Sequence, residues 1–336
     1  MAPSTTGIVA GVSAIAAFYV LMRRLRQRQT VVLITGASGY LGQHLLQRLA
    51  NNARYSLHGT YSGNPSFVED WDGAAVCHKV AMDDPRAIAA LMDKVRPDVV
   101  VHLAAISSPA KAEGDPVRAK AINCPTALVD GLESHASIIF LSTDQVYCGR
   151  RAPYVETAAA EPVNVYGQSK LDFERTLQAK VPGRSVSLRM SLLLGPPAPK
   201  RSFKKNSFLQ DCDRMLSSNK PHDFFSDEFR SVVAVDDVLH VLQWAIDGGA
   251  KVAPGVYNMG GPAMHGHSGP SRVDVARAVA AHRGHSEANI NGIPRPPPGP
   301  GGVRSPPDIS MDSSKLERAA GVRFRPLSKM LSTAFP

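Results

Sequence analysis

The chain has 336 residues, of which 43% are hydrophobic and 20% are charged. This balance is typical of a folded globular protein and excludes a mainly disordered chain, a collagen-like chain and a polytopic membrane protein. The net charge is +9, but four arginines lie close together within residues 23–28, so the charge argues against nucleic acid as a partner and leaves an anionic substrate or cofactor open.

Residues 1–29 form the first predicted segment, a membrane anchor with a basic flank. No charged side chain occurs in residues 1–22, and residues 7–22 are a nearly unbroken apolar run. As a helix this run spans about 24 Å, and extending it back to Thr5 brings it closer to a bilayer core of about 30 Å. Because the positive charges follow the run, we expect residues 5–22 to anchor the protein in a membrane with its catalytic body facing the cytosol. A weakly structured targeting segment is the alternative.

From residue 31 onward, short apolar runs alternate with helical patterns. The runs read as strands at residues 31–35, 56–61, 99–105, 138–142 and 186–189. One of the intervening helices is predicted from the capping Asp84 and Pro85 to about Val95. This alternation predicts an α/β fold with a Rossmann-type doubly wound parallel sheet. The strands are continuous apolar runs, so helices should cover both faces of the sheet.

The first strand runs directly into a glycine-rich loop that predicts a dinucleotide site. The loop reads GASGYLG from Gly36 to Gly42 and is followed by a helical pattern. Small residues let the backbone approach a pyrophosphate, and the helix N-terminus offers N–H groups and a positive dipole end. An ordinary tight turn is the alternative, but the strand, loop and helix order favours a cofactor site. The candidate cofactor-binding residues here are Gly36, Ser38, Gly39, Tyr40, Leu41 and Gly42.

The end of the second strand favours NADP(H) over NAD(H). NAD-specific sites usually place an acidic residue there, about 20 residues after the glycine loop, but the first acid in this chain is Glu69. Thr60 and Ser62 offer hydroxyl groups to a 2′-phosphate, and no arginine follows the strand to strengthen that contact. We therefore expect a modest preference for NADP, with acceptance of NAD as the alternative.

A threonine and a tyrosine–lysine pair form the second candidate site. Thr143 directly follows the strand 138–142, and Tyr166 and Lys170 lie four residues apart on one face of a predicted helix. An ammonium beside a phenol favours the phenolate, so we expect Lys170 to lower the pKa of Tyr166. A surface contact is the alternative, but the combination with the glycine loop favours catalysis.

These motifs resemble the extended short-chain dehydrogenase/reductase family, and the resemblance covers residue 30 to the end. It rests on GASGYLG, HLAA, STDQVY and YGQSK. The stretch from Ser142 to Arg175 and the C-terminal RSPPDISMDSSKLER look like the branch with dTDP-4-dehydrorhamnose reductase and the regulatory β subunit of methionine adenosyltransferase. The resemblance assigns the catalytic triad to Thr143, Tyr166 and Lys170, cofactor contacts to Ala104 and Ala105, and a supporting position behind the site to Asn123.

The resemblance also implies the domain organisation. We expect an NAD(P)-binding Rossmann domain over residues 30–189, completed by about 229–247, and a smaller, mainly C-terminal substrate-binding region over residues 190–336. His102 lies in a buried-looking strand and is interpreted as a packed or solvent-bridged histidine, not a catalytic one. The four cysteines are too few and too scattered for a zinc site or a disulfide framework, so we expect no metal.

The implied function is NAD(P)H-dependent reduction of a carbonyl, the keto group of a nucleotide sugar. Tyr166 would donate the proton, Lys170 would hold the nicotinamide ribose, and Thr143 would orient the carbonyl oxygen. Dehydratases of the wider family carry Asp-Glu after the threonine, whereas this chain has Asp144 and Gln145, and an amide cannot accept the proton. A non-catalytic NADP-binding regulatory subunit and a nucleotide-sugar epimerase are the alternatives, and a homodimer or a partner enzyme is left open.

Overall fold

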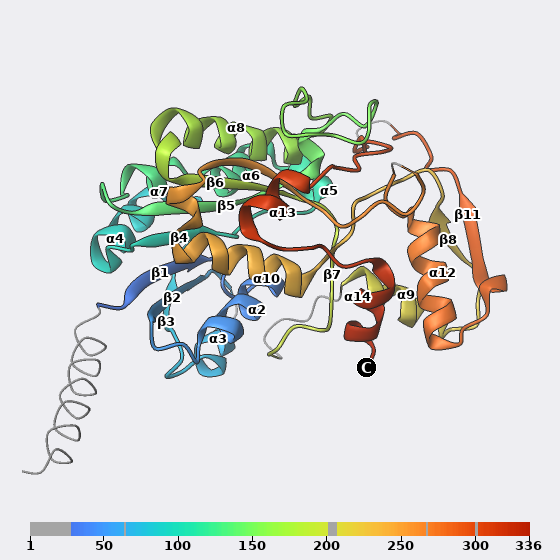
Figure 1. Cartoon of the computed structure of the whole chain (residues 1–336), viewed down its shortest axis with the longest axis horizontal. Helices are drawn as coiled ribbons and strands as arrows, with labels where there is room; N and C mark the ends of the chain where they lie inside the picture. Colours follow the sequence, from blue (N-terminus) through green and yellow to red (C-terminus); the bar gives the residue numbers. More distant parts are fainter. Residues whose placement is uncertain (1–27, 64, 201–206, 267, 300–301) are drawn as a thin grey trace, which may run out of the picture.

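A seven-stranded parallel sheet forms the centre of the protein, in the order β10-β6-β5-β4-β1-β2-β3 (Figure 1). The computed structural model describes residues 28–336, except residues 64, 201–206, 267 and 300–301. The strands of the sheet are β1 (Thr30–Thr35), β2 (Tyr55–Tyr61), β3 (Val76–Lys79), β4 (Val99–His102), β5 (Ser137–Thr143), β6 (Ser185–Met190) and β10 (Gly255–Met259). The order reverses at β1, as in a doubly wound nucleotide-binding sheet. The predicted fold class is confirmed.

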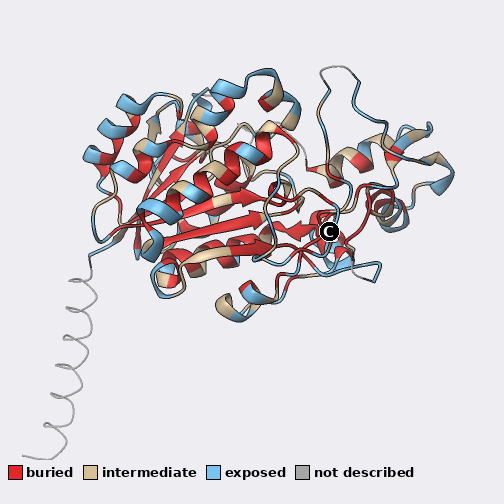
Figure 2. Ribbon diagram, turned by 90° about the horizontal axis from the view of Figure 1, so that it is seen from above, coloured by how far each residue is buried: buried red, intermediate tan, exposed pale blue. Residues whose placement is uncertain are grey.

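Helices cover both faces of this sheet because successive strand residues point to opposite sides. Val32 and Ile34 of β1 join one hydrophobic core, whereas Leu33 joins the other. The first face carries α2 (Tyr40–Leu49), α3 (Ser66–Asp70), α10 (Val235–Trp244) and α13 (Ser314–Ala320). The second face carries α4 (Pro85–Val95), α7 (Thr126–Asp130) and α8 (Val165–Lys180). Figure 2 shows the strands buried between helices whose outer sides are exposed.

Helix α4 shows how local sequence fixes these elements. The Asp84 carboxylate accepts hydrogen bonds from the backbone N–H groups of Arg86 and Ala87, and Pro85 occupies the first turn. The helix ends after Val95, where Arg96 takes a left-handed conformation with φ 47°. The predicted bounds of this helix are confirmed.

The C-terminal part of the chain builds a third hydrophobic core, the C-terminal core, beside the carboxyl ends of the strands. Its helices are α9 (Phe208–Leu216), α12 (Arg272–Arg283) and α14 (Leu327–Ala334). Its strands form two small parallel sheets, β7 (Leu193–Leu194) with β9 (Val233–Ala234) and β8 (His222–Phe225) with β11 (Ile290–Ile293). Two further short helices, α5 (Pro109–Gly114) and α6 (Pro116–Asn123), pack against α8, and α11 (Ala250–Val252) precedes β10.

The structure corrects the predicted membrane-anchored location with a cytosolic body. Within residues 28–336, as far as they are described, no helix is both long and apolar enough to cross a membrane. The longest helix there, α8, has 16 residues and includes Lys170, Asp172 and Glu174, whereas a span needs about 20 mainly apolar residues. The predicted anchor itself, residues 5–22, lies outside the described residues.

Candidate active site

The glycine loop after β1 brings the chain unusually close to the end of β4. Gly36 has φ +67°, and a Cβ atom placed on it would lie 2.7 Å from the backbone N and Cα of Ala104. A Cβ on Gly42 would lie 2.5 Å from the carbonyl oxygen of Gly36. The loop therefore requires glycine at both positions. Helix α2 begins after Gly39, and no side chain caps its first turn. In this arrangement a helix N-terminus can bind a phosphate.

A cavity of about 1210 Å³ runs from this loop to the tyrosine–lysine pair. It opens at the carboxyl ends of β1, β2, β4 and β5, the edge at which doubly wound sheets bind ligands. Every candidate residue predicted from the sequence lines it: Gly36, Ser38, Gly39, Tyr40, Leu41, Gly42, Thr60, Ser62, Ala104, Ala105, Thr143, Tyr166 and Lys170. The structure thus brings both predicted sites into one cavity.

Two hydroxyl residues at the end of β2 differ in their surroundings. Thr60 is buried, and its hydroxyl oxygen accepts a hydrogen bond from the backbone N–H of Gly36 at 3.1 Å, so it holds the glycine loop. Ser62 is exposed on the cavity wall. Arg118 from α6 also lines the cavity and donates to the Asp83 carboxylate at 3.0 Å. No local pattern marks this arginine, because it lies more than 50 residues beyond the strand in the chain.

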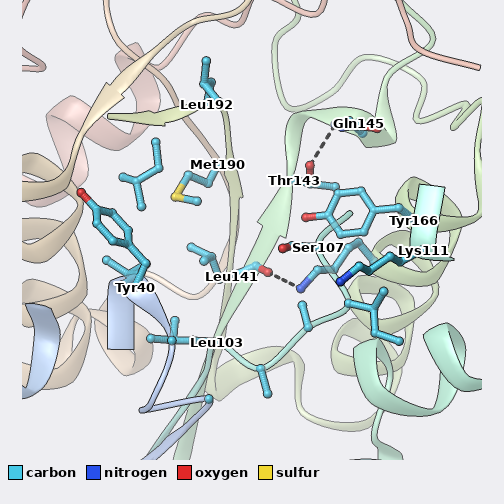
Figure 3. Close-up of a pocket in the computed structure, with 18 of the residues that line it drawn as sticks. Tyr40, Leu103, Ser107, Lys111, Leu141, Thr143, Gln145, Tyr166, Met190 and Leu192 are labelled. Atoms are coloured by element: carbon cyan, nitrogen blue, oxygen red, sulfur yellow. Dashed lines mark hydrogen bonds between the residues drawn. The ribbon is translucent and has the colours of Figure 1, made fainter. Parts of the chain in front are cut away.

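Tyr166 and Lys170 lie on the first turns of α8, and Figure 3 shows Tyr166 beside Thr143 at the end of β5. The Asn164 side chain caps the helix by accepting a hydrogen bond from the backbone N–H of Gly167 at 2.9 Å. The Lys170 ammonium donates to the carbonyl oxygen of Leu141 at 2.8 Å. Tyr166 is 9% exposed and Lys170 is 2% exposed, so both polar ends lie at the floor of the cavity.

Burial dominates the acid–base properties of this pair. It raises the pKa of Tyr166 to about 12; a hydrogen bond with Thr143 opposes this rise and the Asp144 carboxylate adds to it. Burial also lowers the pKa of Lys170 to about 7, against the attraction of Glu174. The prediction that Lys170 lowers the pKa of Tyr166 is therefore wrong for this structure, because desolvation disfavours the charged forms of both groups. Tyr166 remains a protonated phenol at neutral pH.

A buried ion pair lies directly behind Lys170, one helical turn along α8. The Arg189 guanidinium on β6 contacts the Glu174 carboxylate, with a shortest distance of 2.7 Å, and both side chains are almost fully buried. Ser142 Oγ also donates to Glu174. Ser142 on β5 and Arg189 on β6 are paired residues of adjacent strands, which explains why both contact Glu174. Sequence reasoning did not find this pair, although Glu174 shares a helix face with Lys170.

Asn123 and His102 lie behind the cavity. The Asn123 amide donates to Ser169 Oγ at 2.9 Å and its oxygen accepts from the backbone N–H of Ile106 at 2.8 Å. It therefore ties the loop after β4 to helix α8. His102 is fully buried, and its Nδ1 lies 2.7 Å from Thr35 Oγ1. Its ring also contacts two phenylalanine rings, which is the packed arrangement that the sequence predicted.

The far end of the cavity carries a cluster of charged residues that sequence reasoning missed. The Glu228 carboxylate forms ion pairs with Arg230, Arg272 and Arg295, and all four line the cavity. Three guanidinium groups thus gather around one carboxylate, and Asp211 and Asp223 also line the cavity. No local motif marks this cluster because its members come from three separate segments of the chain.

Comparison with known families and sequences finds a matching family model and relatives that include the following two. The profile described as the RmlD substrate binding domain matches residues 30–335. The chain is 34% identical over 166 residues to methionine adenosyltransferase 2 subunit beta of Danio rerio, covering 49% of this chain and 48% of that protein. It is also 34% identical over 155 residues to dTDP-4-dehydrorhamnose reductase of Shigella flexneri, covering 44% of this chain and 46% of that protein. These matches span about half the length of both relatives.

Solved structures of two enzymes share the fold. One is dTDP-4-dehydrorhamnose reductase from Bacillus anthracis in complex with NADP, with a TM-score of 0.73, 19% identity, and coverage of 92% of this chain and 98% of that one. The other is UDP-glucose-4-epimerase from Stenotrophomonas maltophila with bound NAD and formylated UDP-arabinopyranose, also with a TM-score of 0.73, at 21% identity and with coverage of 91% and 97%. At these identities the likeness concerns the fold.

Proposed function

The chain belongs to the RmlD substrate-binding domain family, and from this premise we propose that it is an NADPH-dependent reductase of the keto group of a nucleotide sugar. One observation carries the proposal. A single cavity joins the glycine loop, the Tyr166–Lys170 pair and a cluster of three arginines, which are the parts needed to bind a dinucleotide, a carbonyl group and the anionic diphosphate of the substrate.

The cavity fits a dinucleotide cofactor. Gly36, Gly39 and Gly42 line the cavity without side chains beside the N-terminus of α2, and that terminus suits a pyrophosphate. Ala104 and Ala105 continue the wall from the glycine loop toward Lys170. Ser62 would bind the 2′-phosphate of NADP, since no acid occupies that position. NADPH, when bound, supplies a hydride.

The side chains at the cavity floor would donate the proton and position the groups that receive it. Tyr166 holds its proton at neutral pH because burial raises its pKa to about 12, and it would release that proton to an oxygen on which negative charge develops. Thr143 would orient the same oxygen. Lys170 is fixed by the carbonyl oxygen of Leu141 and would hold the ribose beside Tyr166. Gln145 lacks the basicity that water elimination requires, so reduction is favoured over dehydration.

The C-terminal region, residues 190–336, would bind the nucleotide sugar. It supplies all three arginines of the charged cluster. Guanidinium groups bind phosphate oxygens in a bidentate manner. A sugar carrying a diphosphate would therefore place its anionic portion at this end and its keto group near Tyr166.

Replacing Tyr166 by phenylalanine tests the proposal. With a dTDP-4-dehydro-6-deoxy sugar as the substrate, we expect Tyr166→Phe to reduce NADPH consumption by at least about 100-fold while the Kd for NADPH stays within about twofold. Tyr257→Phe is a matched control, because its hydroxyl bonds to Ala253 outside the cavity, and it should retain full turnover. Full turnover by Tyr166→Phe would show that this phenol is not the proton donor.

A regulatory subunit is the second candidate function. The similarity to a protein named as subunit beta of methionine adenosyltransferase favours it, and association with a partner enzyme or a second copy stays a prediction. Stoichiometric loss of NADPH on adding a keto sugar distinguishes the reductase from this candidate. An epimerase would interconvert sugars without net loss of the cofactor.

A further inference from the structure

Gln145 lies on the wall of the cavity, close to the proposed proton donor. It is the middle residue of the short helical turn η1 (Asp144–Val146), which directly follows β5. Its backbone N–H donates to Thr143 Oγ1 at 3.2 Å (Figure 3). Its carbonyl oxygen packs so closely on α8 that a Cβ atom placed on Gly167 would clash with it. The backbone of Gln145 is therefore fixed between Thr143 and the residue that follows Tyr166.

The neighbouring Asn164 determines which end of the Gln145 amide points to which side. Asn164 Oδ1 accepts from the backbone N–H of Gly167, and this assigns the other end of the Asn164 amide as the nitrogen. That nitrogen, Nδ2, donates to the carbonyl oxygen of Arg304 at 3.0 Å and to the Gln145 side chain at 2.8 Å. Because Nδ2 can only donate, the Gln145 atom that faces it is the oxygen Oε1.

The opposite end of this amide, Gln145 Nε2, faces the cavity. Among the described residues Nε2 has no hydrogen-bond partner, and it is not buried. Gln145 is partly exposed, and the open space beside it is the cavity. An amide nitrogen donates two hydrogens and accepts none. A ligand in the cavity therefore meets a group that only donates and whose orientation is fixed.

The sugar offers one good acceptor beside the reacting carbonyl group. In a 4-dehydro-6-deoxy sugar, the keto carbon has two neighbours. C3 carries a hydroxyl group, whereas C5 carries a methyl group and the ring oxygen. With the keto oxygen at Thr143 and Tyr166, as the proposed reductase function requires, the C3 hydroxyl group is the better acceptor within reach of the next side chain, Gln145.

We propose that Gln145 Nε2 donates a hydrogen bond to the C3 hydroxyl group of the sugar and is a specificity-determining residue, an inference that rests on the proposed function. Asn164 is then a positioning residue, because it turns the donor end of the amide toward the sugar. A sugar that lacks this oxygen leaves the donor without a partner once the sugar has displaced water from the cavity, and such a loss weakens binding. The site should therefore select a hydroxylated sugar over its 3-deoxy counterpart.

Comparing two sugars that differ only at C3 tests this contact. Binding is measured by isothermal titration calorimetry with NADP⁺ present, which carries no hydride, so the keto sugar is bound but not reduced. We expect the wild type to bind dTDP-4-dehydro-6-deoxyglucose at least about fivefold more tightly than its 3-deoxy counterpart. Gln145→Met, which keeps the length without the donor, should bind the two sugars within about twofold of each other.

Gln168→Met is the matched control, because Gln168 is exposed and its amide bonds to Asp172 on the same helix. It should keep the wild-type preference. Equal binding of both sugars by the wild type, or an unchanged preference in Gln145→Met, would overturn the proposal.

Gln145→Glu is a second variant that keeps the oxygen facing Asn164 and replaces only the donor. At about pH 8, where a glutamate carboxyl group is ionised, it presents an acceptor to the cavity. A C3 hydroxyl group can donate to this acceptor, whereas a fluorine atom at C3 cannot. The 3-deoxy-3-fluoro sugar should therefore lose at least about tenfold more affinity than the hydroxylated sugar, and equal losses would contradict the assigned orientation of Gln145.

The binding assay separates this contact from the proposed reaction. A wild type that shows the expected preference but consumes no NADPH refutes the reductase function and supports the contact. Stoichiometric consumption of NADPH without any preference between the two sugars refutes the contact alone. A wild type that binds neither sugar overturns both.

Discussion

Replacing Lys170 by methionine removes a charge from the protein interior, and we expect it to stabilise the protein without bound cofactor at neutral pH. Burial lowers the pKa of Lys170 from 10.5 to about 7. The folded protein therefore either buries an ammonium or releases its proton at pH 7, and both cost free energy of folding. Methionine has a similar length, carries no charge and fits an apolar surrounding.

The magnitude follows from the difference between the two pKa values. A difference of about 3.5, at about 1.4 kcal/mol for each pKa unit, corresponds to a cost of about 5 kcal/mol at pH 7. Loss of the hydrogen bond to the Leu141 carbonyl oxygen reduces this gain in stability by about 1–3 kcal/mol. Lys170→Met should therefore raise the free energy of unfolding by about 2–4 kcal/mol at pH 7.

The gain should depend on pH in a defined direction. Between pH 7 and pH 10.5 the unfolded state binds more protons at Lys170 than the folded state, so raising the pH stabilises the wild type. The advantage of Lys170→Met should therefore shrink by about 1.4 kcal/mol for each pH unit above 7. Below pH 7 the lysine is charged in both states, and the advantage should be constant.

Equilibrium urea unfolding at pH 6, 7, 8 and 9 measures both effects. Lys180→Met is the matched control on the same helix, because the Lys180 side chain is 47% exposed and pairs with Asp130 at the surface. Its unfolding free energy should change by less than about 1 kcal/mol, with no dependence on pH. A Lys170→Met variant that is less stable than the wild type at pH 7, or whose advantage grows with pH, would refute the reasoning.

Two further predictions concern the cofactor end of the cavity. Gly36→Ala should abolish detectable NADPH binding and destabilise the protein by at least about 1–3 kcal/mol, because φ is +67° and the new methyl group would lie 2.7 Å from the Ala104 backbone. Gly73→Ala is the control, because Gly73 has φ +73° but open space around it, so it separates the effect of backbone strain from that of the close contact. Equal effects in both variants would contradict the role of the contact with Ala104. Ser62→Asp should weaken NADPH binding at least about tenfold and leave NADH binding nearly unchanged, as fluorescence titration would show. Ser62→Asn is the uncharged control for this variant. An equal loss of affinity for both cofactors in Ser62→Asp would contradict the proposed contact with the 2′-phosphate.

The sequence by itself determined the parts of this protein that depend on local chemistry. Gly36 and Gly42 mark the loop because only a residue without a side chain allows such close backbone contacts. Continuous apolar strands between helical segments fix a parallel sheet covered on both faces. The four-residue spacing of Tyr166 and Lys170 puts them on one side of α8, and this follows from helix geometry without any tertiary contact.

Some strands were not evident from the sequence. β3 is short and lies at the edge of the sheet, and its inner residues are only partly buried, so it lacks the apolar run that marks the other strands. β10 pairs with β6 on the opposite edge, although residues 191–254 separate the two strands in the chain. Both strands are stabilised by pairing partners far away in the chain, which local propensity does not reveal.

Only the tertiary structure decided the electrostatics of the site. Spacing predicts that Lys170 lowers the pKa of Tyr166, but the depth of both side chains in the fold makes desolvation the larger effect. The gathering of Arg230, Arg272 and Arg295 around Glu228 likewise depends on how separate segments of the C-terminal region meet at the cavity. Charge interactions and burial depend on distance in space, so the sequence names these residues without showing that they share a site.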